Sequence, residues 1–141
     1  MQVRRFWLLS VFQVVALGVL IWLLATYKTP WNAQRYIGTV LTVVGVSFMI
    51  VARVELGKSF SIRPEAHELV TTGLYSKIRN PIYVFGMVMF TGVAMVVQRL
   101  SLSIILVVLA VVQVIRARRE ARVLEAAFGD AYREYRRQTW F

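Results

Sequence analysis

The stretch His67–Gly86, HELVTTGLYSKIRNPIYVFG, lies among apolar segments that are long enough to cross a lipid bilayer. It contains the only histidine of the chain, two tyrosines, an arginine, an asparagine and a proline. A loop that only joined two membrane helices would not need this mixture of side chains. Because loops often carry binding and catalytic residues, we interpret the stretch as a polar site at the membrane surface and expect an enzyme.

Composition places the whole chain in a membrane as one domain. Of the 141 residues, 58% are apolar, and the mean hydropathy is +0.61. Four uncharged segments can serve as membrane helices, the shorter ones with flanking Arg, Lys or Trp side chains that reach the interface. None shows the alternation of period two that a membrane barrel needs. The segments are Phe6–Tyr27, Tyr36–Ala52, Asn80–Gln98 and Leu100–Ile115.

Local signals predict how these helices begin, pack and turn. Pro81 is favoured at a first helical position, because its missing N–H costs nothing there. The segment between the last two apolar runs, Gln98–Ser101, is short enough to be a tight turn, so we expect an antiparallel hairpin. The small residues Gly38, Thr42 and Gly45 share one helix face, which suits close packing against a neighbouring helix.

The last helix is predicted to continue beyond the membrane. Arg116–Phe128 contains good helix formers, Gly129 is a natural C-cap, and Asp130 can N-cap a short helix that ends at Arg137. We therefore predict an all-α integral membrane protein. It would have about four transmembrane helices, a hairpin of the third and fourth, and a C-terminal cytoplasmic helical extension.

The distribution of basic residues predicts the orientation. If the N-terminus is in the cytoplasm, fourteen Lys and Arg residues lie on that side and three on the other. Such an excess favours both termini in the cytoplasm, and all seven acidic residues fall on the same side. The net charge of +10 is then expected to meet anionic lipid head groups and no nucleic acid.

Two charged residues near the end of the fourth apolar segment allow two interpretations. Arg116 and Glu120 are four residues apart, hence on one face of a helix. They could form a simple surface ion pair. Alternatively, the carboxylate could bind a cationic ligand beside a guanidinium that binds an anionic group.

The other polar residues and glycines of the stretch are weak signals when each is taken alone. His67 has no second His and no Cys in reach of a metal site, so we expect no bound metal and no disulfide. Arg79–Pro81 could be ordinary helix capping by an Asn followed by a Pro, or a helix N-terminus that presents free N–H groups to a ligand carboxylate. Gly86 could permit tight packing or open space for a ligand, and Gly73 is expected at a turn with positive φ.

The order of these residues resembles a known family. HELVTTGLYSKIRNPIYVFG is similar to the pattern H-x-L-V-x-x-G-x-Y-x-x-x-R-H-P-x-Y-x-x-G of the isoprenylcysteine carboxyl methyltransferases and their bacterial relatives, within a wider group of membrane phospholipid methyltransferases. The segment Glu120–Tyr135 resembles the second family pattern, E-E-x-x-L-x-x-x-F-G-x-x-Y-x-x-Y, and Leu56–Ser61 resembles bacterial members.

The resemblance implies specific roles and a division of the chain. Residues 1–55 would be two N-terminal transmembrane helices, and residues 56–141 a cofactor-binding, methyltransferase-like region in a bacterial inner membrane. Glu120 and Arg116 would be the catalytic pair, with Arg116 on the substrate. The residues implied in binding S-adenosylmethionine are His67, Glu68, Leu69, Val70, Tyr75, Asn80, Pro81, Ile82, Tyr83 and Glu120. Apart from the resemblance, Arg79 could hold the carboxylate of this cofactor through its charge.

The chain departs from the family pattern at two positions. Asn80 stands where the family has histidine, so a titratable imidazole is missing. Ala121 replaces the second glutamate of the pair, so one carboxylate remains. We expect cofactor binding to persist and the acceptor to differ.

The chemistry favours a carboxylate on a lipophilic acceptor. A carboxylate is already ionised at neutral pH, whereas an amine would have to lose a proton, and the chain offers few bases for that step. The expected partners are a lipid or lipophilic small molecule and the surrounding lipids; glycines at 38, 45 and 92 would also suit a homodimer.

Two other functions remain open on the sequence. A membrane reductase of the sterol reductase type would use NADPH, with Arg118, Arg119 and Arg122 as sites for its phosphates. The second is a small non-enzymatic membrane protein, either a transporter or an assembly protein. The four apolar segments contain no charged residue of the kind that ion-coupled transport requires, which argues against such transport and leaves a structural role open.

Overall fold

The computed structural model describes residues 28–60, 69–99 and 101–141, with the side chains at 58–60 and 101 left out, and seven helical positions between Val15 and Thr26. The elements in these ranges are α2 (Ala33–Phe60), a 3-10 turn η1 (Gly73–Ser76), α3 (Pro81–Val97), α4 (Ser101–Phe128) and α5 (Asp130–Gln138). The predicted all-helical membrane fold is confirmed. Most of the first predicted helix, Phe6–Tyr27, lies outside the described residues.

Length and composition distinguish one candidate membrane span and one shorter apolar helix. Within the described ranges, Ala33–Gly57 is long and apolar enough to cross a bilayer, and Pro81–Val97 is a shorter apolar helix. The helix predicted over Tyr36–Ala52 is longer than expected, because α2 continues past Arg53 to Phe60. The arginine marks the end of the apolar segment, but it is a good helix former and gives the helix no reason to stop.

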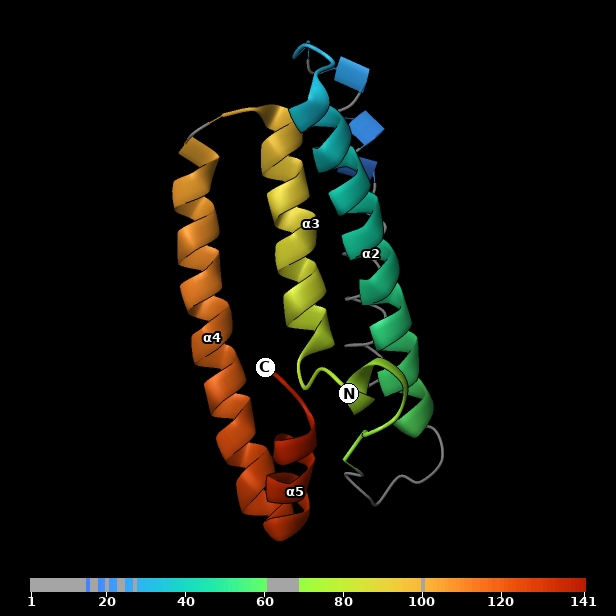
Figure 1. The fold of residues 1–141 in the computed structure, drawn as a ribbon, viewed down its shortest axis with the longest axis vertical. Helices are drawn as coiled ribbons and strands as arrows, with labels where there is room; N and C mark the ends of the chain where they lie inside the picture. The colour runs from blue at the N-terminus through green and yellow to red at the C-terminus, as the bar shows by residue number, and fades with distance from the viewer. Residues whose placement is uncertain are drawn as a thin grey trace.

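Helices α2 and α3 lie side by side (Figure 1) because glycines remove the side chains between them. A Cβ atom on Gly45 would lie 2.6 Å from the Met89 backbone nitrogen, and one on Gly38 would lie 2.7 Å from the Gly92 carbonyl oxygen. Both distances are shorter than real contacts allow. The predicted role of these small residues in packing is therefore confirmed, and a hydrophobic core of Val46, Met49 and Met89 continues the interface.

Helices α3 and α4 form the predicted hairpin. Helix α3 begins at Pro81 and ends at Val97, after which Gln98 adopts a left-handed conformation (φ 55°) and donates its backbone N–H to the Ala94 carbonyl. Helix α4 then runs without interruption to Phe128, where Gly129 (φ +51°) ends it. In Figure 1 this long helix carries α5 at its far end.

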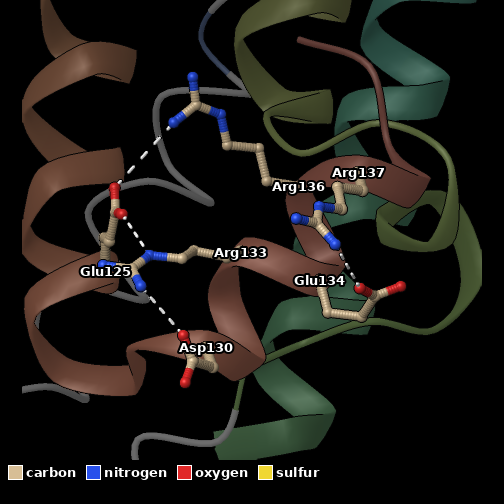
Figure 2. Close-up of polar contacts among 6 residues, drawn as sticks. All are labelled: Glu125, Asp130, Arg133, Glu134, Arg136 and Arg137. Carbon is tan, nitrogen blue, oxygen red and sulfur yellow. Dashed lines mark hydrogen bonds and ion pairs between the residues drawn. The ribbon is translucent and has the colours of Figure 1, made fainter.

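Ion pairs tie α5 to the end of α4. Figure 2 shows Arg133 between Glu125 and Asp130, with its Nε 2.9 Å from Glu125 Oε1 and its Nη1 3.0 Å from Asp130 Oδ1. Arg136 lies 4.0 Å from the same glutamate. The prediction that Asp130 N-caps this helix is wrong. Gly129 occupies the cap position, and Asp130 is already helical, where its carboxylate accepts from Arg133.

Residues near position 140 bind back to the loop before α3. The Trp140 backbone N–H donates to the Lys77 carbonyl (3.0 Å), and the Arg79 N–H donates to the Trp140 carbonyl (3.2 Å). The Asn80 N–H donates to the Phe141 oxygen (3.0 Å). This parallel bridge, centred on Ile78 and Trp140, holds the segment that leads into the first turn of α3.

Candidate functional site

The two family-like segments meet through one hydrogen bond. The Tyr83 hydroxyl, on the first turn of α3, donates to Glu120 Oε2 on α4 at 3.1 Å. Tyr83 is half-buried and Glu120 is exposed, so the pair lies at the rim of the helix bundle. Two residues 37 positions apart, both predicted in the site, therefore belong to one polar cluster.

Arg116 joins this cluster without pairing with Glu120. Neither residue forms an ion pair with any other described residue, so the simple i, i+4 ion pair that the sequence allowed is absent there. The Arg116 guanidinium acts electrostatically on the Tyr83 hydroxyl. A cation, a carboxylate and a phenol thus gather where α3 begins, and both charged side chains are exposed and accessible to a ligand.

Tyr75 lies in the η1 turn and is 92% buried, since its exposed fraction is 8%. Burial raises the pKa of this phenol well above its ordinary value, and the nearby negative charge of Glu120 raises the pKa further. The hydroxyl therefore stays protonated at neutral pH and can donate a hydrogen bond. The turn is shaped by Gly73, whose φ of +60° confirms the expected left-handed conformation.

The start of α3 has polar side-chain atoms without partners among the described residues. Asn80 stands at the N-cap, but its side chain makes no capping hydrogen bond, so the ordinary capping interpretation is wrong for it. Its backbone carbonyl instead accepts from the N–H groups of Tyr83 and Val84. Arg79 Nε is buried without a hydrogen-bond partner in the described structure. A free amide and a guanidinium at a helix N-terminus suit an anionic group.

The remaining predicted residues divide into two groups. His67 and Glu68 lie outside the described residues, so their predicted roles stay predictions. Leu69 and Val70 are half-buried on the approach to η1, and Pro81 and Ile82 form the first turn of α3 beside Asn80. The described part of the predicted cofactor segment thus leads directly to the Tyr83–Glu120 contact.

Sequence reasoning missed two residues at the end of α2. Glu55 Oε2 accepts the Leu74 backbone N–H at 2.8 Å and so holds the η1 turn. Arg53 acts electrostatically on the Tyr75 hydroxyl, and its Nε is buried with no hydrogen-bond partner in the described structure. An arginine at the end of an apolar helix looks like an interfacial anchor, so the sequence carried no signal that would have identified this neighbourhood.

A cavity of about 410 Å³ lies at the opposite end of the bundle, near the turn between α3 and α4. Its lining includes Gln34, Gln98 and Arg99. It contains no residue that we predicted in the site. We therefore place the candidate site on the polar cluster at the start of α3, where Tyr83, Glu120 and Arg116 lie together.

Comparison with known proteins supports the sequence resemblance. The sequence model of one family, described as phospholipid methyltransferase, matches residues 14–131. The match includes α2, η1, α3 and α4 and thus both partners of the Tyr83–Glu120 contact. No curated protein and no solved structure matches the chain significantly.

Proposed function

The chain belongs to the phospholipid methyltransferase family, and we propose that it transfers the methyl group of S-adenosylmethionine to a lipophilic acceptor at the cytoplasmic face of a membrane. Family membership and the apolar helix α2 identify a membrane methyltransferase. The cofactor, the acceptor and the side of the membrane are our proposal.

The observation that supports it most is the hydrogen bond between Tyr83 and Glu120. It joins the segment around Arg79–Tyr83 to the acidic residue on α4, although nothing local in the sequence requires them to meet. A methyl transfer between two bound molecules mainly needs alignment and exclusion of water. A site at the junction of two helices can provide the alignment.

The residues present fit S-adenosylmethionine, which supplies a methyl group activated by a positively charged sulfur. The Glu120 carboxylate would offset the positive charge of the cofactor. Arg79, whose buried Nε has no partner in the described structure, and the Asn80 side chain, which makes no capping hydrogen bond, would hold its carboxylate at the N-terminus of α3. Tyr75, kept protonated by burial, would donate a hydrogen bond.

The same residues favour a carboxylate as the acceptor. Arg116 is exposed beside Glu120 on the outer turns of α4, where a guanidinium can orient an anionic group. An amine acceptor would need a base, and the raised pKa of Tyr75 makes its phenolate scarce at neutral pH. We therefore propose a lipophilic acid ahead of a lipid amine.

Calorimetric titration of S-adenosylmethionine into the detergent-purified full chain tests the proposal. We expect saturable binding that weakens about tenfold or more in Glu120→Ala, because a charge-assisted contact is lost. Glu134→Gln is a matched control, since among the described residues this exposed glutamate pairs with Arg137 and Gln138 of its own helix, α5, and with no residue of the site. A folded wild-type protein that binds NADPH and not S-adenosylmethionine would overturn the proposal.

The acceptor is tested separately with radiolabelled cofactor and two vesicle preparations. One contains octadecanoic acid in a phosphatidylcholine matrix, and the other contains phosphatidylethanolamine. Methylation of the acid, lost in Arg116→Ala, supports a carboxylate acceptor. Methylation of the amine alone retains the methyltransferase and removes the carboxylate.

A further inference from the structure

Gln113 is a polar residue in a place where the sequence is otherwise apolar. It is the only polar side chain in Ile104–Ile115, the membrane half of α4. Its Oε1 atom is buried and has no hydrogen-bond partner among the described residues. An amide oxygen buried without a partner is unfavourable, and more so away from water. The position is therefore costly unless something supplies a donor.

The side chain points inward, toward a glycine of α3. A Cβ atom placed on Gly86 would lie 4.0 Å from Gln113 Nε2 and 3.8 Å from the Met49 sulfur, which are ordinary contact distances. Gly86 therefore differs from Gly45 and Gly92, where a Cβ would collide with backbone atoms of the neighbouring helix. Close packing does not require a glycine at position 86, and its absent side chain leaves room beside the glutamine.

This point lies on the same side of the helix pair as the candidate site. Glu120 follows Gln113 by seven residues, which is two turns or about 10 Å along α4. On α3, Gly86 lies one turn beyond Tyr83, the hydrogen-bond partner of Glu120. The glutamine and the glycine thus continue the site from the start of α3 into the apolar part of the bundle.

We propose that Gln113 determines acceptor specificity by accepting a hydrogen bond from a hydroxyl or amide N–H on the chain of the lipid acceptor, at a level about 10 Å along α4 from Glu120. The inference rests on the proposed function and deepens it by naming a feature of the substrate. A plain acyl chain would leave the amide oxygen unpaired. A chain with a donor at the matching depth would satisfy it, and sites built to bond a polar group discriminate well against analogues that lack it.

Binding of two fatty acids that differ in one hydroxyl tests this inference. The probes are octadecanoic acid and 10-hydroxyoctadecanoic acid, added to the detergent-purified chain with affinities measured by thermophoresis. We expect the wild-type protein to bind the hydroxylated acid about fivefold more tightly. Gln113→Leu, which keeps the size of the side chain, should bind both acids equally. Val111→Leu, at a position that is 54% exposed on α4, is the matched control and should keep the preference.

The thermal stability of the same variants separates a binding role from a structural one. Because the buried Oε1 atom of Gln113 has no hydrogen-bond partner in the described part of the protein, Gln113→Leu should melt at the same temperature as the wild type or higher. A clear fall in melting temperature, or an unchanged preference for the hydroxylated acid in this variant, would overturn the inference. Neither the affinity for the two acids nor the melting temperature depends on methyl transfer. A protein that methylated no acceptor would therefore contradict the proposed function and leave this inference standing.

Discussion

The hydroxyl of Tyr135 donates a hydrogen bond of 2.7 Å to the backbone carbonyl of Tyr75, across 60 residues of sequence. One partner lies on α5 and the other in the η1 turn, close to the Tyr83–Glu120 cluster. The contact is buried at both ends, with exposed fractions of 7% and 8%. The last helix therefore supports the wall of the candidate site, in addition to packing on α4.

Removing the Tyr135 hydroxyl should lower the stability of the protein, although the aromatic ring still fills its place in the core. Tyr135→Phe keeps the ring and loses the donor, so a buried carbonyl is left unsatisfied, and we expect a loss of about 1–2 kcal/mol in the free energy of unfolding. Tyr132→Phe is the matched control, because Tyr132 is 2% exposed and its hydroxyl makes no hydrogen bond in the described structure. Equal stability of the two variants in a denaturant titration would contradict the assigned role.

Alkaline pH should release the same contact. Burial, with a smaller contribution from Tyr132, raises the pKa of Tyr135 to about 12, against about 10 in an unfolded chain. The folded state therefore keeps the Tyr135 hydroxyl proton up to a higher pH than the unfolded state does. This contribution to stability is complete below pH 10 and is lost as the pH rises through about 12.

Unfolding measured from pH 9 to pH 12 checks the direction. Tyr135→Phe should lose part of the alkaline decline, because it lacks the titrating group. The pKa of Tyr75 is also raised, so some decline should remain in the variant. An identical pH profile for the variant and the wild type would exclude Tyr135 as a source of the effect.

The two partners of the central hydrogen bond should contribute unequally to cofactor binding. Tyr83→Phe removes one donor to an exposed carboxylate, which water can replace, so we expect S-adenosylmethionine to bind about threefold more weakly. Glu120→Gln removes the charge and should cost about tenfold. Calorimetry on both variants decides this, and a larger loss for Tyr83→Phe would mean that the phenol contacts the cofactor itself.

Alanine should distinguish the two kinds of glycine on the helix interfaces. Gly45→Ala places a methyl group 2.6 Å from the Met89 backbone nitrogen and should cost about 1–3 kcal/mol of stability through overpacking. Gly86→Ala meets only ordinary contacts and should change stability by less than about 1 kcal/mol. Thermal unfolding of the two proteins in the same detergent makes the comparison, and similar destabilisation would refute the space that we assign beside Gly86.

Much of the helical layout followed from the sequence, because helix starts and ends depend on near neighbours. Pro81 begins α3 and Gly129 ends α4 for reasons of backbone geometry that hold in any context. The uncharged segment Tyr36–Ala52 indicated the long apolar helix α2 through its composition. Local rules failed at Asp130, which had the right side chain for a cap but lies one residue too late, since Gly129 took the cap position.

The content of the candidate site was predicted in part. The sequence could select Glu120, Arg116 and Tyr83 from their residue types and order. It could not say that Glu120 would accept a hydrogen bond from Tyr83 and form no ion pair with Arg116. Such a choice depends on how two helices are rotated and shifted against each other. Here the two helices are α3 and α4, which follow each other across the left-handed turn at Gln98.

The sequence by itself determined the helices, their apolar character and the polar residues at their ends, because each depends on chain-local chemistry. Only the tertiary structure decided that α5 and Trp140 hold the loop before α3, that Arg53 lies near Tyr75, and that Gln113 faces the space at Gly86. These relations join residues that are far apart in the chain. Their energies come from burial and hydrogen bonding, which exist only once the helices have packed.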